Sequence, residues 1–430
     1  MNIGQESFLS DLPIGWSYDR FKDVASLRSE RTNDASELED YLELEDIESG
    51  TGRILNRRNT MEVISDVTRF YCGDVLFGKL RPYLAKFYEA EFDGKCTGEI
   101  LAFKPERIAN RFLFYCFASP WFIGRCNMLA YGAKMPRVNW PTQLAQFNLP
   151  LPPLPEQQRI AAYLDASCGA IDAAMVAKRR QIDTLDAFRK TTIHNAITKG
   201  LNSAIARRAS NVGWFGDIPK HWRCEHLKRF TTRIQTGMTP PTDTPDYYLD
   251  GTIPWFSPGS YNGDIELCEP RKLINELARI EGKLRIFPAG TVFLIGIGAT
   301  IGKVGLVPAE ASCNQQIIGI VCGHRMQSRY LTYQFKIYEE VIPGIASATT
   351  LPIFDQVKTG YLPTLQPPIE EQKSICAFLD TKLAESKQIV AGIETQIATL
   401  AAYRKSLIHE CVTGQRRISE EDIKKVKVHG

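Results

Sequence analysis

The sequence predicts an α+β chain in which two similar domains of short strands and helices are separated by two long helices packed as an antiparallel coiled coil. Three observations lead to this prediction. A segment of the first half recurs in the second half in one ungapped register, and both copies carry apolar residues at heptad spacing. The stretches between them contain short apolar runs bounded by glycine.

Composition and charge are those of a folded, soluble protein. The 430 residues include 52 Lys and Arg against 49 Asp and Glu, so the formal net charge is +3, which excludes a disordered basic tail or an acidic solvating chain. No run of about 18 uncharged apolar residues occurs, so we expect a cytoplasmic chain with no membrane partner. The 11 cysteines include no Cys-x-x-Cys pair and are predicted to be buried thiols.

The internal repeat is the most informative feature of the sequence. The run 152–165 (PPLPEQQRIAAYLD) returns as 367–380 (PPIEEQKSICAFLD), 215 residues later, and the register holds without a gap to Thr198 and Thr413. Chance does not align so many unlike residue types, so the chain contains two copies of one unit.

A second repeat opens each half. Residues 11–16 (DLPIGW) match residues 217–222 (DIPKHW), 206 residues later. Between these anchors the halves agree in pattern but hardly in identity. Similar frames with dissimilar contents favour one task performed on two different targets.

Each copy of the long repeat is predicted to form one amphipathic helix. From residue 156 to residue 198 such a helix is about 65 Å long, and the following Gly200 and Gly414 are suitable terminators. A lone helix would expose its apolar stripe, so the two should pack together, antiparallel because a whole globular unit separates them; a buried core helix is the alternative. The seam reads Leu164, Cys168, Ile171, Met175, Lys178, Ile182 and Leu185 in the first copy, and Leu379, Leu383, Ser386, Val390, Ile393, Ile397 and Leu400 in the second.

These signals divide the chain into six segments. Residues 41–47 and 290–296 carry strand signals, and the acidic run from Glu37 to Glu48 is expected to be a solvated strand face. The predicted segments are a first domain (1–150), a first long helix (151–200), a linker of loop composition (201–216), a second domain (217–365), a second long helix (366–415) and a charged, frayed tail (416–430).

A glycine-rich run at residues 296–303 suggests a phosphate-binding loop but fails on spacing. Gly298 lies one residue too close to the Gly-Lys pair, and Val304 follows where Ser or Thr is needed. A turn between two strands is the better interpretation.

Evidence for catalysis is weak. Asp246, Glu281 and Lys283 have the loose form of a metal-dependent nuclease pattern, which leaves a stand-alone nuclease as an alternative function, although the first half has nothing similar. His194 and His409 share one repeat position late in each helix, where packing or a contact with the helix dipole is expected. We predict no catalytic residue and no metal ligand.

Basic residues beside glycine and aromatic residues are the candidates for nucleic-acid contacts. They offer phosphate clamps and base-reading forks, and a near-neutral net charge does not exclude this role, because clustering on one face matters more than the sum. Each residue taken alone is equally explained as an ordinary surface charge. The candidates are Lys79, Arg81, Tyr83, Tyr131, Lys134 and Arg137 in the first domain, and Arg271, Lys272, Thr300 and Lys303 in the second.

In their order and duplication, these motifs resemble the specificity (S) subunit of Type I restriction-modification systems. The Gly-Ala-Thr-Ile-Gly-Lys-Val-Gly run and the later Asn-Gln-Gln are similar to strands of the target-recognition domains in that family. Gly15 stands where the second copy has His221, which makes the first opening segment the looser match. The motifs are Pro-Pro-x-x-Glu-Gln (152–157 and 367–372), Ile-Pro-x-x-Trp (218–222, looser at 12–16), Gly-Trp-Phe-Gly (213–216), the glycine-rich run (298–305) and Asn-Gln-Gln (314–316).

The resemblance implies a non-catalytic role in DNA recognition. In such subunits each of two target-recognition domains reads half of a split double-stranded DNA site, and the helices hold them apart and dock modification subunits, two per chain. S-adenosylmethionine would be bound by the methyltransferase partner, with no cofactor in this chain, and restriction or translocase subunits would join. One added helical turn of about 5.4 Å should change the gap by a base pair or two. A protein-binding coiled-coil scaffold is a further alternative.

Overall fold

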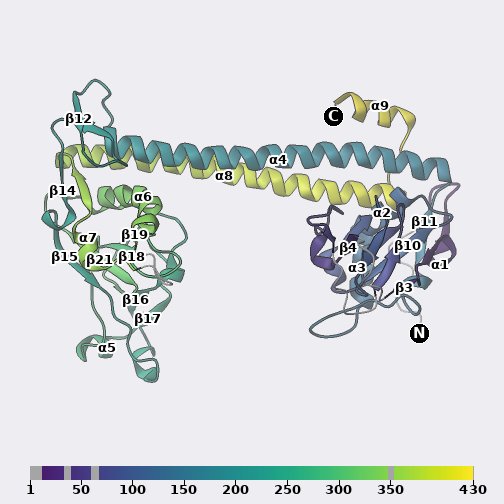
Figure 1. Cartoon of the computed structure of the whole chain (residues 1–430), viewed down its shortest axis with the longest axis horizontal. Helices are drawn as coiled ribbons and strands as arrows, with labels where there is room; N and C mark the ends of the chain where they lie inside the picture. The colour runs from purple at the N-terminus through teal and green to yellow at the C-terminus, as the bar shows by residue number, and fades with distance from the viewer. Residues whose placement is uncertain (1–11, 33–39, 60–66, 347–352, 430) are drawn as a thin grey trace. The chain divides into compact units, whose positions relative to one another are not determined.

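Two long helices run through the chain (Figure 1), α4 (Leu154–Lys199) and α8 (Ile369–Val412). They contain 46 and 44 residues, so each is about 65 to 70 Å long. Each begins beside a proline pair, which suits a helix start. Each is followed by a glycine in the left-handed region, with φ of 70° at Gly200 and 80° at Gly414. The predicted terminators are therefore confirmed.

The computed structural model describes residues 12–32, 40–59, 67–346 and 353–429 and divides into two units. Unit 1 comprises residues 1–180 and 393–430, and unit 2 comprises residues 181–392. The division passes through both long helices, so each unit holds one strand-rich domain with a part of α4 and a part of α8. The boundaries of the six predicted segments stay predictions.

The described residues of the domain in unit 1 form three sheets. Strands β1 and β11 pair antiparallel and bring the two chain ends of the domain together. The other sheets have the orders β2-β10-β7-β8 and β3-β6-β9-β4-β5. The strands are β1 (Ser17–Arg20), β2 (Ala25–Leu27), β3 (Arg31–Thr32), β4 (Asp40–Leu42), β5 (Arg58–Asn59), β6 (Val67–Phe70), β7 (Val75–Gly78), β8 (Phe87–Glu89), β9 (Gly94–Cys96), β10 (Ile100–Pro105) and β11 (Asn148–Leu151). The short helices are α1 (Phe21–Val24), η1 (Leu44–Asp46), η2 (Pro82–Leu84), α2 (Asn110–Ala118), α3 (Pro120–Leu129) and η3 (Leu144–Gln146).

Unit 2 repeats this plan. Strands β14 and β22 pair as β1 and β11 do, and the sheet β15-β21-β18-β19 has the antiparallel order of β2-β10-β7-β8. A third sheet has the order β17-β16-β20. The strands are β12 (Arg207–Ala209), β13 (Asp217–Pro219), β14 (Arg223–His226), β15 (Thr231–Thr236), β16 (Ile253–Phe256), β17 (Lys272–Ile274), β18 (Val292–Ile295), β19 (Val304–Leu306), β20 (Ser312–Cys313), β21 (Ile317–Cys322) and β22 (Pro363–Gln366). The helices are η4 (Leu227–Arg229), η5 (Pro245–Tyr247), η6 (Pro258–Ser260), α5 (Glu276–Ile280), α6 (Ser328–Ile345) and α7 (Gln356–Gly360).

In each unit the domain and the two helix segments share one apolar core. In unit 1, Leu164 of α4 and Leu407 and Ile408 of α8 lie in the same cluster as the aromatic side chains of α1, α2 and α3. In unit 2, Ile197 of α4 and Leu379 of α8 lie with the tyrosines of α6. The helices therefore serve as walls of two cores, which is why they are stable at this length.

Within unit 1 the helices run antiparallel, as predicted. Asp172 of α4 pairs with Arg404 of α8 at 3.1 Å, and Lys178 donates a hydrogen bond to Gln396. The partner number on α8 falls as the number on α4 rises. All the predicted seam residues are buried or half-buried within their units, including the polar Lys178.

By length and composition alone, one 18-residue stretch of α4 is apolar enough to cross a membrane, and 39% of that stretch is buried. Packing accounts for this apolar character. Ile160, Leu164 and Ile171 lie in the core of unit 1, while Asp165 and Asp172 of the same stretch pair with arginines.

The acidic segment differs from its prediction. Strand β4 ends at Leu42, and the chain turns into η1, where Asp46 is only 1% exposed. Arg58 Nε donates to Asp46 at 2.9 Å and the same guanidinium pairs with Glu43 and Glu45. A solvated strand face is therefore wrong for the described part, because one arginine gathers three carboxylates; the start of the run lies outside the described residues.

The linker and the tail contain structure that their composition did not predict. Strand β12 of the linker pairs with β13, at the start of the second domain segment, to form a hairpin. In the tail, Ile418 is buried in the core of unit 1, and α9 (Glu420–His429) follows it, with Ser419 and Asp422 bonded to each other at its start. The frayed tail was a wrong prediction, because one buried side chain fixes the start of a short helix.

The shared core predicts a large effect of Leu379→Ala. Its side chain is fully buried between α8 and the domain of unit 2, so we expect a loss of about 2 to 5 kcal/mol in the free energy of unfolding, measured by urea denaturation. The neighbouring Phe378→Ala is the control, since Phe378 is 36% exposed. Equal losses in both variants would contradict the packing described.

Candidate nucleic-acid interface

In unit 1 the structure brings together two loops whose candidate residues are about fifty positions apart. The first loop follows β7 and the second follows α3. Arg81 N donates to Pro136 O at 2.7 Å, and Val138 N donates to Lys79 O at 3.1 Å. Tyr131 and Arg137 exchange backbone hydrogen bonds and close the second loop. All six predicted residues of the first domain therefore belong to one paired-loop structure.

This loop surface carries exposed cationic and aromatic groups. Tyr83 and Tyr131 are 56% and 59% exposed, and Lys134 is exposed beside them. Met135 of the second loop is also exposed, as is Met128 at the end of α3, and both were missed from the sequence. The signal that could have identified them is their position on either side of Tyr131 and Gly132. We call Lys79, Arg81, Tyr83, Tyr131, Lys134 and Met135 the unit 1 loop surface.

An ion pair constrains Arg137, and a left-handed backbone conformation constrains Arg81. The Arg137 guanidinium binds both carboxylate oxygens of Glu99 at 3.0 to 3.2 Å, which raises the pKa of Arg137. Arg81 has a φ of 50°, a conformation held by its backbone bond to the second loop. Arg137 thus supports the shape of the surface, while Lys79 and Lys134 have no ion pair within the part of the chain that the structure describes.

In unit 2, Arg271 and Lys272 lie at the β16-β17 edge. Arg271 N donates to Trp255 O at 3.0 Å, and Lys272 Nζ lies 4.6 Å from the ring centroid of Tyr248. The two cationic side chains are exposed, and α5 beside them exposes Ile280 at 79%. Figure 1 shows β17 and α5 at the end of unit 2 away from its helix segments. This layer is the second candidate surface.

Thr300 and Lys303 lie elsewhere, in the turn from β18 to β19. These strands pair antiparallel, and Gly298 and Gly302 have φ of 106° and 90°. The interpretation as a turn between strands is confirmed. Lys303 lines a pocket whose other walls come from α4, α6, α8 and the loop at residues 261–265. The four candidates of the second domain therefore form two separate groups.

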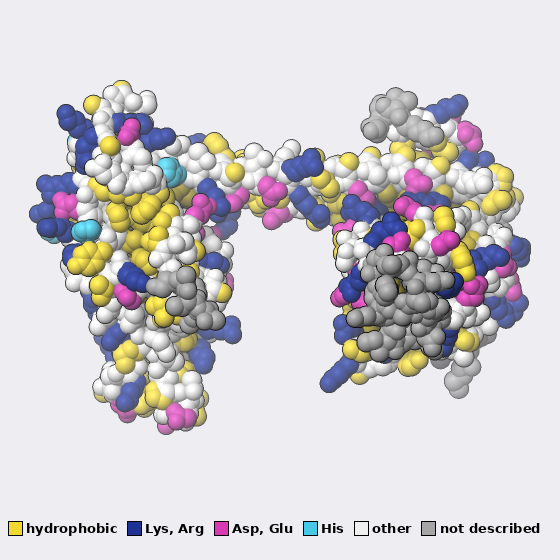
Figure 2. Space-filling view, viewed as in Figure 1, with side chains coloured by type: hydrophobic (Ala, Val, Ile, Leu, Met, Phe, Trp, Pro, Cys, Tyr) yellow, Lys and Arg dark blue, Asp and Glu magenta, His cyan; other side chains and the backbone are white. Residues whose placement is uncertain are grey.

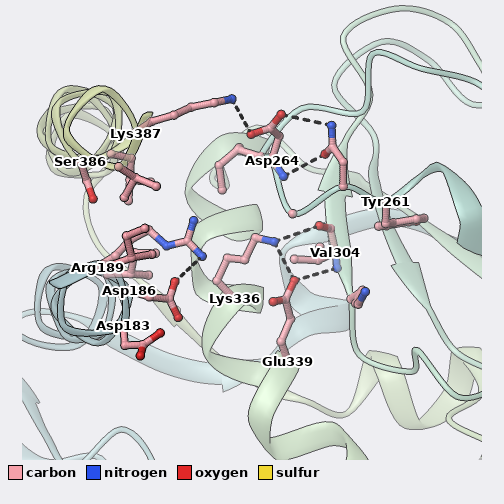
Figure 3. Close-up of a pocket in the computed structure, with 18 residues that line it drawn as sticks. Asp183, Asp186, Arg189, Tyr261, Asp264, Val304, Lys336, Glu339, Ser386 and Lys387 are labelled. Carbon is pink, nitrogen blue, oxygen red and sulfur yellow. Dashed lines mark hydrogen bonds and ion pairs between the residues drawn. The ribbon is translucent and has the colours of Figure 1, made fainter. Parts of the chain in front are cut away.

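That pocket, of about 580 Å³, is shown in Figure 3. Its charged groups are largely satisfied by one another. Lys387 of α8 pairs with Asp264 at 3.0 Å, and Lys336 pairs with Glu339 at 2.7 Å. The pocket is therefore a space between the helix segments and the domain of unit 2, lined by apolar side chains and by paired charges.

A further basic surface was missed from the sequence. Figure 2 shows Lys and Arg side chains gathered over β12 and β14. Glu225 pairs with one of them, Arg229, at 3.3 Å. Counting cations along this stretch would have found the surface, whose exposed members are Arg207, Arg208, Lys220, Arg223, Lys228 and Arg229.

The residues of the nuclease pattern make structural contacts. Tyr247 donates its hydroxyl to Glu281, which raises the pKa of Tyr247, and the Asp246 carbonyl accepts from Asn275. Among the described residues no group of three or more His, Cys, Asp and Glu could hold a metal ion. These contacts give the nuclease alternative no support.

The cysteines and repeat histidines also pack as structural residues. Seven cysteines are buried, but Cys72 and Cys268 are exposed, so the prediction of buried thiols is confirmed for most. Burial raises the pKa of Cys96 to about 12. His194 Nε2 lies 2.9 Å from Trp214 O, and burial lowers the pKa of His409.

Comparison with known proteins places this architecture. The family model of the Type I restriction modification DNA specificity domain matches residues 13–184 and 225–399. The specificity subunit of the Type I restriction enzyme EcoDI from Escherichia coli is 28% identical over 228 residues, covering 51% of this chain and 46% of that protein. The MjaIX specificity subunit from Methanocaldococcus jannaschii is 32% identical over 193 residues, 43% of each chain. A putative MjaX specificity subunit from the same organism is 24% identical over 377 residues, covering 81% and 80%.

Solved structures support the same fold. A chain from a structural study of assembly and conformational transition in the type I R-M system gives a TM-score of 0.76 at 20% identity, covering 95% of this chain and 100% of that one. The HsdS subunit of Thermoanaerobacter tengcongensis gives 0.53 at 19% identity, covering 95% and 99%. The chain spans about half the length of the first two curated relatives. With a family model that matches both halves and a fold of two repeated domains on long helices, the chain belongs to the Type I restriction-modification DNA specificity family.

Proposed function

We propose that this chain reads a two-part double-stranded DNA sequence for a Type I restriction-modification complex, with each strand-rich domain reading one half. The observation that carries the proposal is the duplication of one domain plan with different exposed surfaces. Both domains keep the same four-stranded sheet order, whereas unit 1 presents its loop surface and unit 2 presents the β16-β17 layer. Different contact surfaces on one framework suit two unlike half-sites.

The loop surface of unit 1 has the chemistry of a DNA contact. Lysines neutralise phosphates, arginine can bind a guanine edge, and exposed tyrosine and methionine offer apolar contacts to bases. In unit 2, Arg271 and Lys272 supply the same cationic groups at the edge of β17. The proposed DNA contacts are Lys79, Arg81, Tyr83, Lys134, Arg271, Lys272, Thr300 and Lys303, with Arg137 shaping the loop that presents its neighbours.

The long helices set the spacing between the half-sites in this proposal and dock two modification subunits. An α-helix does not stretch, so in this proposal the long helices keep the gap between the half-sites constant. Phe188 and Ile389 in unit 2 and Tyr403 in unit 1 are exposed apolar side chains on the helices, which suit contacts with a partner protein.

Catalysis belongs to the partners in this proposal. The modification subunit binds S-adenosylmethionine and transfers the methyl group, and this chain is non-catalytic and holds no cofactor. Restriction or translocase subunits complete a cleaving complex. The chain acts in the cytoplasm, where DNA and these partners meet, without a membrane contact.

Exchange of residues 230–350 for the equivalent stretch of a relative tests independent reading. We expect the methylated sequence to change in one half only, because the exchanged residues include the β16-β17 layer and leave unit 1 intact. Long-read methylome sequencing of cells with the modification partner measures this. Alteration of both halves would contradict the proposal.

The combined change Lys79→Ala and Lys134→Ala tests the unit 1 loop surface. We expect weaker DNA binding by the assembled complex. The slope of the logarithm of the binding constant against the logarithm of the salt concentration should also become shallower by about one per lysine, because each lysine neutralises one phosphate. Binding titrations at several salt concentrations measure both effects. Lys104→Ala removes an exposed charge from the end of β10 that pairs with β2, and serves as the control. Equal losses in the control and the double variant would exclude this surface.

A further inference from the structure

An arginine and a tyrosine of α2 hold an aspartate of α4 in unit 1. Arg111 Nε and the Tyr115 hydroxyl both donate to Asp165 Oδ1, each at 2.7 Å. The same guanidinium donates to Glu89 of β8 at 3.1 Å. One arginine thus connects the long helix, the short helix and the sheet.

Unit 2 contains the same arrangement on different elements. Arg329 Nε of α6 donates to Asp380 Oδ1 of α8 at 2.8 Å, and the Tyr333 hydroxyl donates to the same oxygen. Arg329 also pairs with Glu266. Asp165 and Asp380 occupy the same position of the long repeat, so the contact is duplicated along with the fold.

A buried glutamine makes a second duplicated contact two turns earlier on each long helix. Gln157 accepts from Ala109 N at 2.7 Å and donates to Pro152 O at 2.9 Å. Gln372 accepts from Gln327 N at 2.8 Å and donates to Pro367 O at 2.8 Å. These glutamines are the last residues of the repeated Pro-Pro-x-x-Glu-Gln motif and are 1% and 0% exposed.

Ala109 and Gln327 are the N-cap residues of α2 and α6. Each glutamine therefore accepts a hydrogen bond from the backbone amide at the start of the short helix. Each aspartate accepts hydrogen bonds from an arginine and a tyrosine in the following turns of the same short helix. The two contacts fix both the position and the rotation of that helix on the long helix. An apolar core is non-directional and does not supply such a constraint by itself.

The two parts of this contact differ in burial. The glutamines lie inside, where an unpaired amide is costly. The aspartate side chains are 42% and 37% exposed. A substitution of the aspartate therefore removes a constraint on the orientation of the short helix, without leaving an unpaired charge in the core.

We propose that Asp165 and Asp380, together with Gln157 and Gln372, are positioning residues that set how each DNA-reading domain is oriented on its long helix. Through this orientation they define the number of base pairs tolerated between the half-sites. This inference rests on the proposed function. The residues touch no base, so they affect which gap is accepted and not which bases are read.

The test uses the full chain assembled with its modification subunit in cells, and long-read methylome sequencing as the readout. For Asp380→Asn we expect both half-site sequences to stay the same. Methylation at sites whose gap is one base pair shorter or longer should rise about tenfold relative to the wild-type chain, the fold-change that corresponds to about 1.4 kcal/mol of lost discrimination. Asp165→Asn should have the same effect through unit 1.

Two further variants separate positioning from stability. Tyr333→Phe keeps the ring in the core and removes only the hydroxyl that donates a hydrogen bond to Asp380. It should therefore also raise methylation at sites whose gap is one base pair shorter or longer. Glu385→Gln removes a carboxylate of α8 that pairs only with Lys382 of the same helix among the described residues, and it should leave the gap unchanged. Thermal unfolding of the purified chains verifies that all variants are folded.

An unchanged gap distribution in folded Asp380→Asn and Tyr333→Phe would overturn the inference, as would a change in the bases read. A wild-type chain that directs methylation to an uninterrupted site would instead overturn the proposed function, so the two failures are distinguishable.

Discussion

The structure depends on how the apolar stripes of two very long helices are covered. Neither strand-rich domain is large enough to bury a stripe of about 65 Å, so α4 and α8 cover each other, and the domain of each unit covers what remains near the helix ends. Because the helices are antiparallel, the start of α4 and the end of α8 lie in the same unit. Unit 1 therefore needs residues 393–430 to complete its core, and neither half of the sequence corresponds to a unit.

The opening turns of the two halves follow from this arrangement. Trp222 N donates to Pro219 O at 3.0 Å, and the indole lies against Gly200 at the end of α4; Trp16 repeats this turn against Gly414 at the end of α8. Trp222 Nε1 donates to Glu371, whereas Trp16 Nε1 has no partner among the described residues. The weaker sequence match of the first opening segment thus accompanies a less complete set of contacts.

Much of the fold could be predicted from the sequence because its signals are local and periodic. The ungapped repeat and the heptad seam identified both helices, and the glycines after them identified their ends. The glycine-rich turn between β18 and β19 was also readable, because its spacing excluded a phosphate loop. These features depend on residues within a few turns of one another.

The features that could not be predicted from the sequence depend on contacts between residues that are distant in sequence. Arg58 neutralises an acidic run twelve to fifteen positions earlier, and the loop of Arg81 meets the loop of Pro136 only in the folded domain. The paired candidates of unit 1 were found one by one, without any signal that they share a surface. In unit 2, Arg271 and Lys303 looked equivalent in sequence but lie on separate elements.

Only the aspartates of the duplicated contact could be identified from the sequence. Asp165 and Asp380 stand in the repeated segment, 215 residues apart, but their partners Arg111 and Arg329 are 218 residues apart, in a stretch where the halves share little identity. A repeat search finds the first pair and not the second. Only the folded structure shows how the repeated register of the helices is connected with the dissimilar domains that they carry.

In the proposed function, two unlike domains each read one half of a DNA site, and the inextensible long helices fix the gap between the halves. Methylome sequencing of cells that contain the wild-type chain and its modification partner tests this most directly. We expect one modified site with two unlike specific parts, separated by a constant number of unspecified base pairs. A site without a gap, or a gap that varies freely from one modified site to the next, would contradict it.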